Sequence, residues 1–453
     1  MQQLSQSLSA NLAELDRMFG TSADYYAKEI TIYHCKAVIL LFDGMASLDS
    51  LWTLLLDAAS RQAPPVQQCP GCTGLQAYEL ILHDSAFPAE NAPVEDMDEL
   101  TKRLTAGMAV LLLDGCAKGI AFSVQGLKFR SVGEPSGEGN LRGSREGFAD
   151  LLRVNLSLLR RLIRSEQLVQ EAAQADTGMR TEYAICYCKN KADPAMVQRV
   201  RKTLAAAKPE LLLDSSYFVP WLLPGKARLF TPVSYTAAKL CEGKIVVLVN
   251  GSPSAMVLPA LFCENFECLD DYASTAVFSS FLRVLKYISF YLTVFLPGVF
   301  VCLAVYLPEL IPPQLLYRIE AAEKATPLPL FAEMLLVMLI LEVIREAGLR
   351  MPQSLGHSVS LVSALIIGDA AIATGLMSTP VIFVASITAI AVFVTPSLYE
   401  PATLLRLGVV LAAGLAGPVG LAGAFFAFLL SLSGTACLQV PYLAAHPVPQ
   451  RMA

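Results

Sequence analysis

The sequence predicts a soluble α/β N-terminal region of two small subdomains, followed by an α-helical transmembrane domain of about four to five spans. Three observations lead to this prediction. Of the 453 residues, 54% are hydrophobic and only 16% are charged, whereas about 25% are charged in a typical soluble protein. Only six of the 34 basic and eight of the 39 acidic side chains lie after residue 286. Strand-like and helix-like segments alternate before that point, a pattern typical of α/β domains.

These composition changes divide the chain into five segments. Residues 1–22 form a polar N-terminal segment, residues 23–145 the first cytoplasmic α/β subdomain, residues 146–275 the second subdomain, residues 276–440 the transmembrane domain, and residues 441–453 a short tail. The opening residues lack the apolar core of a secretory signal. We therefore expect the soluble region to lie in the cytoplasm.

Local patterns indicate the elements of the first subdomain and the start of the second. Ile30–Phe42 is a β-rich run, and Leu48–Ala59 has helical apolar spacing. Val110–Leu113 and Gly119–Val124 read as paired strands around a turn. Glu146–Ala173 then predicts a long helix that leads into the second subdomain.

The second subdomain continues with alternating elements. Glu182–Cys188 and Lys244–Val249 read as strands, and Pro194–Ala207 as a helix that begins at a proline. Asn250-Gly251-Ser252-Pro253 is a turn signal. Strand order is not readable from these patterns.

Several classes of function are disfavoured. The formal net charge is −5 and no basic stripe appears, so we expect no nucleic-acid partner. The soluble region contains no dinucleotide fingerprint, P-loop or HExxH motif, so we expect neither enzymatic activity nor a cofactor. The pairs Cys69/Cys72 and Cys186/Cys188 lack the CxxC…CxxC spacing of a zinc site, so we expect structural cysteines and no metal.

Long uncharged runs predict the membrane helices. Residues 287–308 are enough to cross about 30 Å of hydrocarbon, and Arg283 and Lys286 before them favour a cytoplasmic start. Residues 351–399 contain a single charge, and residues 407–450 contain none. We expect helix kinks at Pro297, Pro396 and Pro418.

Ionisable side chains within these runs are candidates for a pore. Asp369 lies near the middle of an expected span at about 358–378, where an ionised carboxylate costs several kcal/mol unless it meets water or a partner. It faces either a pore or a hydrogen-bonding neighbouring helix.

The helix-like segment 327–350 offers four more candidates. At 100° per residue, Glu342, Arg345 and Glu346 share an arc of about 100° and Glu333 lies opposite Glu342. These residues form either local ion pairs or a ring that lines a pore in an oligomer.

Three motifs resemble those of a known family. The run from Glu342 to Pro352 is similar to the E-x-x-REAG-x-R-x-P signature of the GerA family, the A subunits of bacterial spore germinant receptors. Gly133–Phe148 resembles the family's EP-x-x-E-x-x-x-RG-x-RE-x-F motif, and the stretch from Glu242 to Pro253 resembles its EG…DGSP motif. The likeness covers about residues 20–447. Two motifs depart from the pattern, because Thr231–Tyr235 replaces TERPD and Gly368–Ala371 replaces GQAA.

The resemblance implies a subunit of a germinant receptor in the inner membrane of a bacterial spore. It implies an oligomer that conducts ions, in contact with membrane lipid, with a transporter-like B subunit that binds nutrient and a lipoprotein C subunit as partners. It further implies a cytoplasmic salt-bridge network, or alternatively a solvated charged surface, formed by Glu134, Glu138, Arg142, Arg145 and Glu146.

Two other functions compete with the receptor. One is an accessory membrane protein of the dipicolinate-release machinery. The other is a secondary transporter, for which the sequence shows no inverted repeat.

Overall fold

The computed structural model describes most of the chain. It describes residues 3–32, 35–46, 73–83, 91–124, 146–176, 180–207, 209, 212–222, 229–230, 233–272, 275–350 and 370–444. The chain forms two compact units. The first comprises Met1–Ala260 and Ala436–Val440, and the second comprises Leu261–Thr435 and Pro441–Ala445.

The first unit begins with a five-stranded subdomain. Its elements are α1 (Leu8–Phe19), β1 (Tyr25–Ile32), β2 (Cys35–Phe42), α3 (Gly74–His83), β3 (Asn91–Val94), α4 (Met97–Thr105), β4 (Ala109–Leu113) and β5 (Gly119–Phe122). The strand order is β1-β2-β4-β5-β3, and every neighbouring pair is antiparallel.

Both faces of this sheet are covered, which explains why β4 is apolar throughout and β2 is apolar except for the exposed Lys36. Successive side chains of a strand point to opposite faces. Ile39 packs in a cluster with Ile81 of α3, whereas Leu40 packs with Leu15 of α1 and Leu104 of α4. Residues 8–19 are therefore part of the core of the first subdomain rather than of a separate polar segment.

The second subdomain repeats this arrangement. Its elements are α5 (Leu152–Leu162), β6 (Leu168–Gln174), β7 (Glu182–Cys188), α6 (Pro194–Ala206), η1 (Ser215–Phe218), α7 (Val219–Leu222), β8 (Leu229–Phe230), α8 (Val233–Cys241), β9 (Ile245–Val249) and β10 (Ala255–Leu258). The strand order is β6-β7-β9-β10-β8. In both sheets the subdomain's first, second, fourth, fifth and third strands lie side by side in that order, and all neighbouring pairs are antiparallel.

Several expected elements are confirmed and one is wrong. The paired strands β4 and β5, the strands β7 and β9, the helix α6 and the turn at Gly251 are present. The β-rich run Ile30–Phe42 contains the end of β1 and all of β2, which fold back on each other as an antiparallel pair. Residues 146–173 are not one long helix, because α5 ends at Leu162 and β6 pairs with β7. Residues 48–59 lie outside the described residues.

The error at β6 has a physical cause. Its sequence contains glutamate, alanine and glutamine, which favour helices. However, Leu168, Val169 and Gln170 are buried beside β7, and tertiary packing of this kind overrides such weak preferences.

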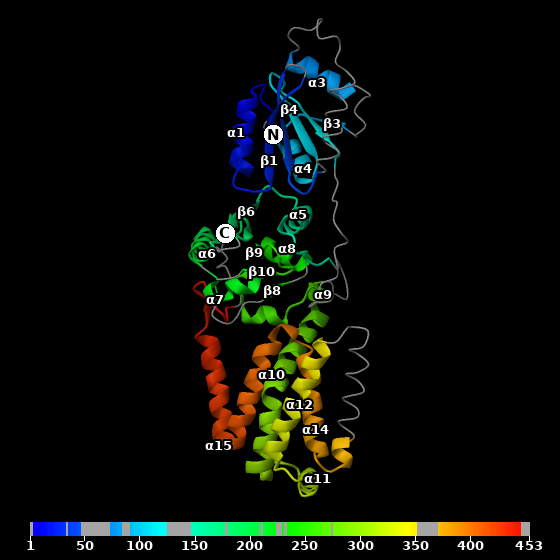
Figure 1. Ribbon diagram of the computed structural model, residues 1–453, viewed down its shortest axis with the longest axis vertical. Coiled ribbons are helices and arrows are strands. Elements are labelled where there is room, and N and C mark those ends of the chain that lie inside the picture. Colours follow the sequence, from blue (N-terminus) through cyan, green and yellow to red (C-terminus); the bar gives the residue numbers. More distant parts are fainter. Residues whose placement is uncertain are drawn as a thin grey trace. The chain divides into compact units, whose positions relative to one another are not determined.

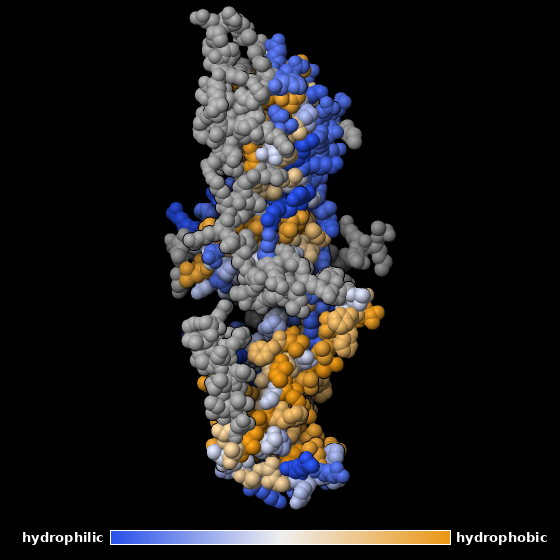
Figure 2. Space-filling model, turned by 90° about the vertical axis from the view of Figure 1, so that its right-hand side faces the viewer, coloured by the Kyte–Doolittle hydropathy of each residue, from blue (hydrophilic) through white to orange (hydrophobic). Residues whose placement is uncertain are grey.

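The second unit is mainly helical. It contains η2 (Phe262–Phe266), α9 (Leu269–Tyr272), α10 (Ala276–Tyr306), η3 (Pro308–Leu310), α11 (Pro313–Glu323), α12 (Leu330–Arg350), α14 (Thr379–Val392), η4 (Pro396–Leu398) and α15 (Tyr399–Ser433). The short strands β11 (Ala436–Cys437) and β12 (Val440–Pro441) pair after α15. Apolar side chains gather over the helices, whereas the first unit is mostly hydrophilic on the face shown in Figure 2.

Two helical stretches among the described residues are long and apolar enough to cross a membrane. They are Ala276–Tyr306 and Pro396–Ser433, and Thr379–Val392 is a shorter apolar helix. Helices α12 and α14 run in the same direction (Figure 1), with Met334 and Val381 in one buried cluster.

Helix α15 reverses direction in its middle. Gly417 has φ 56° and ψ −134°, which no helix adopts. A Cβ at Gly420 would lie 1.9 Å from the carbonyl oxygen of Ala412, although eight residues of a straight helix span about 12 Å. The two arms, 399–416 and 418–433, lie side by side as orange and red ribbons in Figure 1. Each arm is about 24–27 Å long, close to the ~30 Å of a hydrocarbon core.

Candidate functional site

A charged cluster joins α12 to the first arm of α15. Glu342 Oε1 accepts hydrogen bonds from Arg345 Nη2 at 2.9 Å and Nε at 3.2 Å. Its other oxygen, Oε2, accepts from the Tyr399 hydroxyl at 2.5 Å and lies 3.7 Å from Arg406 Nη2. The Arg345 guanidinium lies 3.5 Å from the centroid of the Tyr399 ring, which is a cation–π contact. One carboxylate therefore organises three side chains from two helices.

The cluster carries more positive than negative charge. The Arg406 side chain is only 4% exposed, and its Nε has no hydrogen-bond partner among the described residues. Of the residues that the structure describes, Glu342 is the single carboxylate within ion-pair distance of both guanidinium groups. A buried cation is costly unless it is paired, so Glu342 is the residue that keeps both arginines in place.

A second buried acid links α12 to α14. Glu333 is fully buried, and its Oε1 accepts a hydrogen bond from the backbone N–H of Ser378 at the start of α14. Free N–H groups at a helix N-terminus favour an acidic partner. Within the described part of the chain, Oε2 of Glu333 has no hydrogen-bond partner.

The structure thus accounts for four of the five pore candidates. Glu333, Glu342 and Arg345 make contacts within the chain, among them an ion pair between Glu342 and Arg345. Glu346 pairs with Arg350 at 2.7 Å on the exposed end of α12. Asp369 lies outside the described residues.

The three expected kinks are of different kinds. Pro297 lies inside α10, whereas Pro396 begins the short turn η4 between two helices. Pro418 directly follows the reversal at Gly417. Next to Pro297, Gly298 permits close packing of α15, because a Cβ there would lie 2.6 Å from Val409 Cγ1.

The expected cytoplasmic network falls mostly outside the described residues. The described residues include Glu146 of this network, but not Glu134, Glu138, Arg142 or Arg145. Glu146 forms an ion pair with Arg161, and its carbonyl accepts a hydrogen bond from Val233 N at 3.1 Å. Glu146 therefore connects α5 to α8 within the second subdomain.

A buried ion pair joins the two subdomains instead. Arg160 Nε lies 2.8 Å from Asp24 Oδ2, and Nη2 lies 3.0 Å from Oδ1. Ser22 Oγ accepts from the same guanidinium, which also lies 4.4 Å from the Phe42 ring centroid. Arg160 donates two further bonds to the carbonyls of Ser165 and Leu168. The arginine is fully satisfied, as a buried charge must be.

The Asn250–Pro253 motif forms a turn that organises its surroundings. Asn250 Oδ1 accepts from the first backbone N–H of α5 at 3.1 Å. Ser252 and Ser254 donate to Asp214 from the same turn. Burial raises the pKa of the Asp214 carboxyl. Hydrogen bonds from Ser216 and Ser252 lower this pKa by more than burial raises it, so the net pKa lies below its usual value. The motif therefore has a clear structural role.

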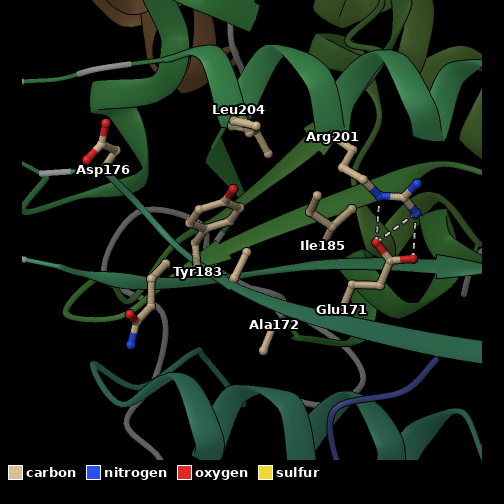
Figure 3. A pocket seen from close by; sticks show the side chains of 10 residues that line it. Glu171, Ala172, Asp176, Tyr183, Ile185, Arg201 and Leu204 are labelled. Atoms are coloured by element: carbon tan, nitrogen blue, oxygen red, sulfur yellow. Dashed lines mark hydrogen bonds and ion pairs between the residues drawn. The ribbon is translucent and has the colours of Figure 1, made fainter. Parts of the chain in front are cut away.

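A shallow groove lies beside the edge strand β6 (Figure 3). It has a volume of about 360 Å³ and is lined by β6, β7 and α6. Glu171 and Arg201 form a bidentate ion pair at its rim, with distances of 2.7–3.0 Å. Tyr187 donates to Glu171, and burial followed by this hydrogen bond raises the pKa of its hydroxyl.

Cys186 and Cys188 of this subdomain are buried thiols, whereas Cys241 at the end of α8 is exposed. Burial raises the pKa of Cys188 to about 11, and Cys186 is wholly inaccessible. Cys69 and Cys72 lie outside the described residues. Within the described part of the chain, no group of three His, Cys, Asp or Glu side chains could hold a metal ion.

Comparison with known proteins connects these features to one family. The model of the family described as "Bacillus/Clostridium GerA spore germination protein" matches residues 13–451. The match runs through both units and includes the ionic cluster. The chain belongs to the GerA family.

Individual relatives of this GerA-family chain are named for germination and sporulation. It is 29% identical to spore germination protein KA of Bacillus subtilis (strain 168), over 97% of this chain and 82% of that one. It is 27% identical to stage V sporulation protein AF of the same organism, over 94% of this chain and 86% of that one.

One solved structure resembles part of the GerA-family chain. It is the N-terminal domain of the A subunit of the Bacillus megaterium spore germinant receptor GerK3. Sequence identity is 22% and the TM-score is 0.46, with 57% of this chain and 97% of that one covered.

Sequence reasoning about this GerA-family chain missed Arg406 and Tyr399. Arg406 is the only charged residue between Glu400 and Arg451, so its isolation in an apolar run was the available signal. Tyr399 gave no signal, because its role depends on the approach of α12. Arg160 was also missed, since its partner Asp24 is 136 residues away.

Proposed function

We propose that the chain is the membrane-embedded A-type subunit of a spore germinant receptor, which oligomerises and releases ions when nutrient is sensed. The observation that supports this most strongly is the family match over residues 13–451, which includes both the soluble unit and the apolar helices. In this proposal the first unit is cytoplasmic, the membrane is the inner membrane of the spore, and the partners are a nutrient-binding B subunit and a lipoprotein C subunit.

The fold supports an even number of membrane crossings. Residues 436–440, which follow α15, belong to the first unit. Cys437 is buried in its core, and Arg199 donates to the carbonyl of Leu438 at 3.2 Å. A chain that leaves and re-enters the same unit crosses the membrane an even number of times. This arrangement supports four spans rather than five within the expected range, and with the first unit proposed as cytoplasmic, the end of α15 is proposed to lie on the cytoplasmic side.

The ionic cluster has a defined role in this proposal. Glu342, Arg345, Tyr399 and Arg406 tie α12 to α15, so relative movement of these helices requires the cluster to open. Glu333 ties α12 to α14 in the same way. The proposed pore-lining residues are Glu333, Glu342, Arg345, Glu346 and Asp369, and opening of these contacts would free the first four of them to face the pore.

The test is reconstitution of the full chain with its B- and C-type partners in liposomes. We expect a discrete oligomer by native mass spectrometry. We also expect nutrient-dependent release of encapsulated potassium ions, measured with a potassium-sensitive dye outside the liposomes. Asp369→Asn should alter the conductance without changing the mass of the oligomer. A monomeric chain with no ion release in the presence of both partners contradicts the proposal.

A second candidate function is an accessory role in dipicolinate release. It is supported by the likeness to stage V sporulation protein AF over 94% of this chain. Deletion of the gene separates the two functions. Loss of germination with one class of nutrient supports the receptor, whereas normal nutrient specificity with slowed dipicolinate release supports the accessory role. Counter-exchange of a substrate by the chain alone would instead indicate a secondary transporter.

A further inference from the structure

The segment formed by η1 and α7 in the second subdomain has a buried face and an exposed apolar face. Phe218 and Leu222 are buried in the core of this subdomain. Tyr217 and Trp221, each one position earlier, are 41% and 42% exposed, and Leu213 is 51% exposed. Large apolar side chains that are exposed together mark interaction surfaces. We refer to Leu213, Tyr217 and Trp221 as the η1–α7 patch.

The core behind the patch also contains the chain that follows α15. Cys437 is fully buried in the same cluster as Phe218 and Leu222. In Figure 1, α7 lies beside this red segment of the chain. Helix α15 ends at Ser433, and four residues of chain span at most about 14 Å. The η1–α7 patch therefore belongs to a core that is covalently held close to the end of a membrane-crossing arm.

This distance is comparable to the polar layer of a bilayer. The headgroup regions add about 5–8 Å to each side of a hydrocarbon core of ~30 Å. The arm 418–433 is about 24 Å long, so its end does not rise far above the hydrocarbon. Cys437 and the core around it are therefore within reach of the headgroups.

The side chains of the patch suit the boundary between lipid and water. Trp and Tyr are enriched at this boundary, because their rings are apolar while their N–H and O–H groups are polar. Arg199 of α6 adds positive charge beside the same segment, since its exposed side chain donates to the carbonyl of Leu438 at 3.2 Å. Basic side chains near the cytoplasmic leaflet are attracted by anionic headgroups. Apolar side chains with a neighbouring cation are the pattern of a peripheral membrane contact.

We propose that the η1–α7 patch inserts into the headgroup layer of the membrane that α15 crosses, so that phospholipid covers Leu213, Tyr217 and Trp221. The inference rests on the proposed function for the presence of the membrane. It adds a contact with lipid that is made by the second subdomain and not by the apolar helices.

Tryptophan fluorescence tests this contact directly. The sequence contains two tryptophans, Trp52 and Trp221, so the variant Trp52→Phe leaves Trp221 as the reporter. The full chain is reconstituted in liposomes that contain brominated phospholipid, whose bromine atoms quench tryptophan on contact. We expect a loss of Trp221 emission that is larger for bromine near the headgroups than for bromine near the ends of the acyl chains. Acrylamide, added to the water, should quench Trp221 only weakly.

A tryptophan in the first subdomain is the matched control. Leu75 of α3 is an apolar side chain of similar exposure, at 54%. In the chain Trp52→Phe/Trp221→Phe/Leu75→Trp, acrylamide should quench the emission strongly and brominated phospholipid should not change it. Where Trp52→Phe fails to fold, the difference in emission between the unsubstituted chain and Trp221→Phe gives the same measurement.

The outcomes separate this inference from the proposed function. Protection from acrylamide without quenching by brominated phospholipid shows that protein covers Trp221 and overturns the lipid contact. Equal acrylamide quenching at positions 221 and 75, again without quenching by lipid, shows that the patch faces water and also overturns it. Both results leave the proposed function standing as long as the chain stays in the liposomes. A chain that alkaline carbonate washes off the liposomes is not embedded, which overturns the proposed function itself.

Discussion

Arg160 and Asp24 form a bidentate ion pair in the interior of the first unit, although 136 residues separate them in the sequence. Their side chains are 0% and 5% exposed. The pair connects the helix α5 of the second subdomain to the residue before β1 of the first. The two subdomains, which share one strand order, are therefore joined through a charge that has no access to water.

Removal of one partner should destabilise the first unit strongly. Asp24→Ala leaves the Arg160 guanidinium buried without its counter-charge, which typically costs about 3–5 kcal/mol. Urea unfolding of the full chain, followed by hydrogen exchange in β1 and α5, measures this loss. The control is Glu95→Gln, which breaks the exposed pair with Lys118 and should cost under about 1 kcal/mol. Equal effects of the two substitutions would contradict the role of burial.

The ionic cluster predicts an asymmetry between its members. Glu342→Gln leaves both Arg345 and Arg406 without a carboxylate and should destabilise the helical unit by about 2–4 kcal/mol. Arg406→Met removes the cation whose Nε has no partner and should change stability by less than about 1 kcal/mol. Thermal unfolding of the detergent-purified chain compares the two. A larger loss for the Arg406 variant would show that Arg406 is the organising residue.

The reversal in α15 depends on the absence of a side chain at Gly420. Gly420→Ala places a methyl group against the carbonyl oxygen of Ala412 and should cost about 1–3 kcal/mol. Gly423→Ala is the matched control, because a Cβ at that position meets nothing within 4 Å. It should be neutral or slightly stabilising, since alanine favours helices. The expected readout is a lower melting temperature for the first variant only.

Asp214 predicts a dependence of stability on acid pH. Its pKa in the folded protein lies below the unfolded value of about 3.9. The stabilisation from the ionised carboxylate is therefore fully present above about pH 4 and is lost as the pH falls through the folded pKa. Urea midpoints between pH 2 and 6 should fall less steeply toward acid for Asp214→Asn than for the unsubstituted chain. Parallel curves would show that the serine hydroxyls do not stabilise the charge.

Much of the architecture could be predicted because it depends on the charge and the hydrophobic pattern of residues that are close together in the sequence. The fall in charge after residue 286 separates the soluble unit from the apolar helices. Strands such as β7 and β9 and the helix α6 follow from local patterns. A kink at Pro418 was predicted as well, but the direction of the chain after it was not. A glycine at positive φ permits many directions, so the direction taken depends on packing with other segments, and Tyr306 of α10 lies close to Gly417.

The sequence by itself determined the partition between soluble and membrane-like parts, most of the soluble strands and helices, and membership of the GerA family. Only the tertiary structure decided which charges meet. Glu342 shares an arc of one helix with both Arg345 and Glu346, yet its further partners Tyr399 and Arg406 come from another helix. Local spacing places side chains around a single helix, whereas the pairing of buried charges depends on which helices pack together. Which helices pack together depends on the apolar contacts of all the helices in the core, and these contacts join residues that are far apart in the sequence.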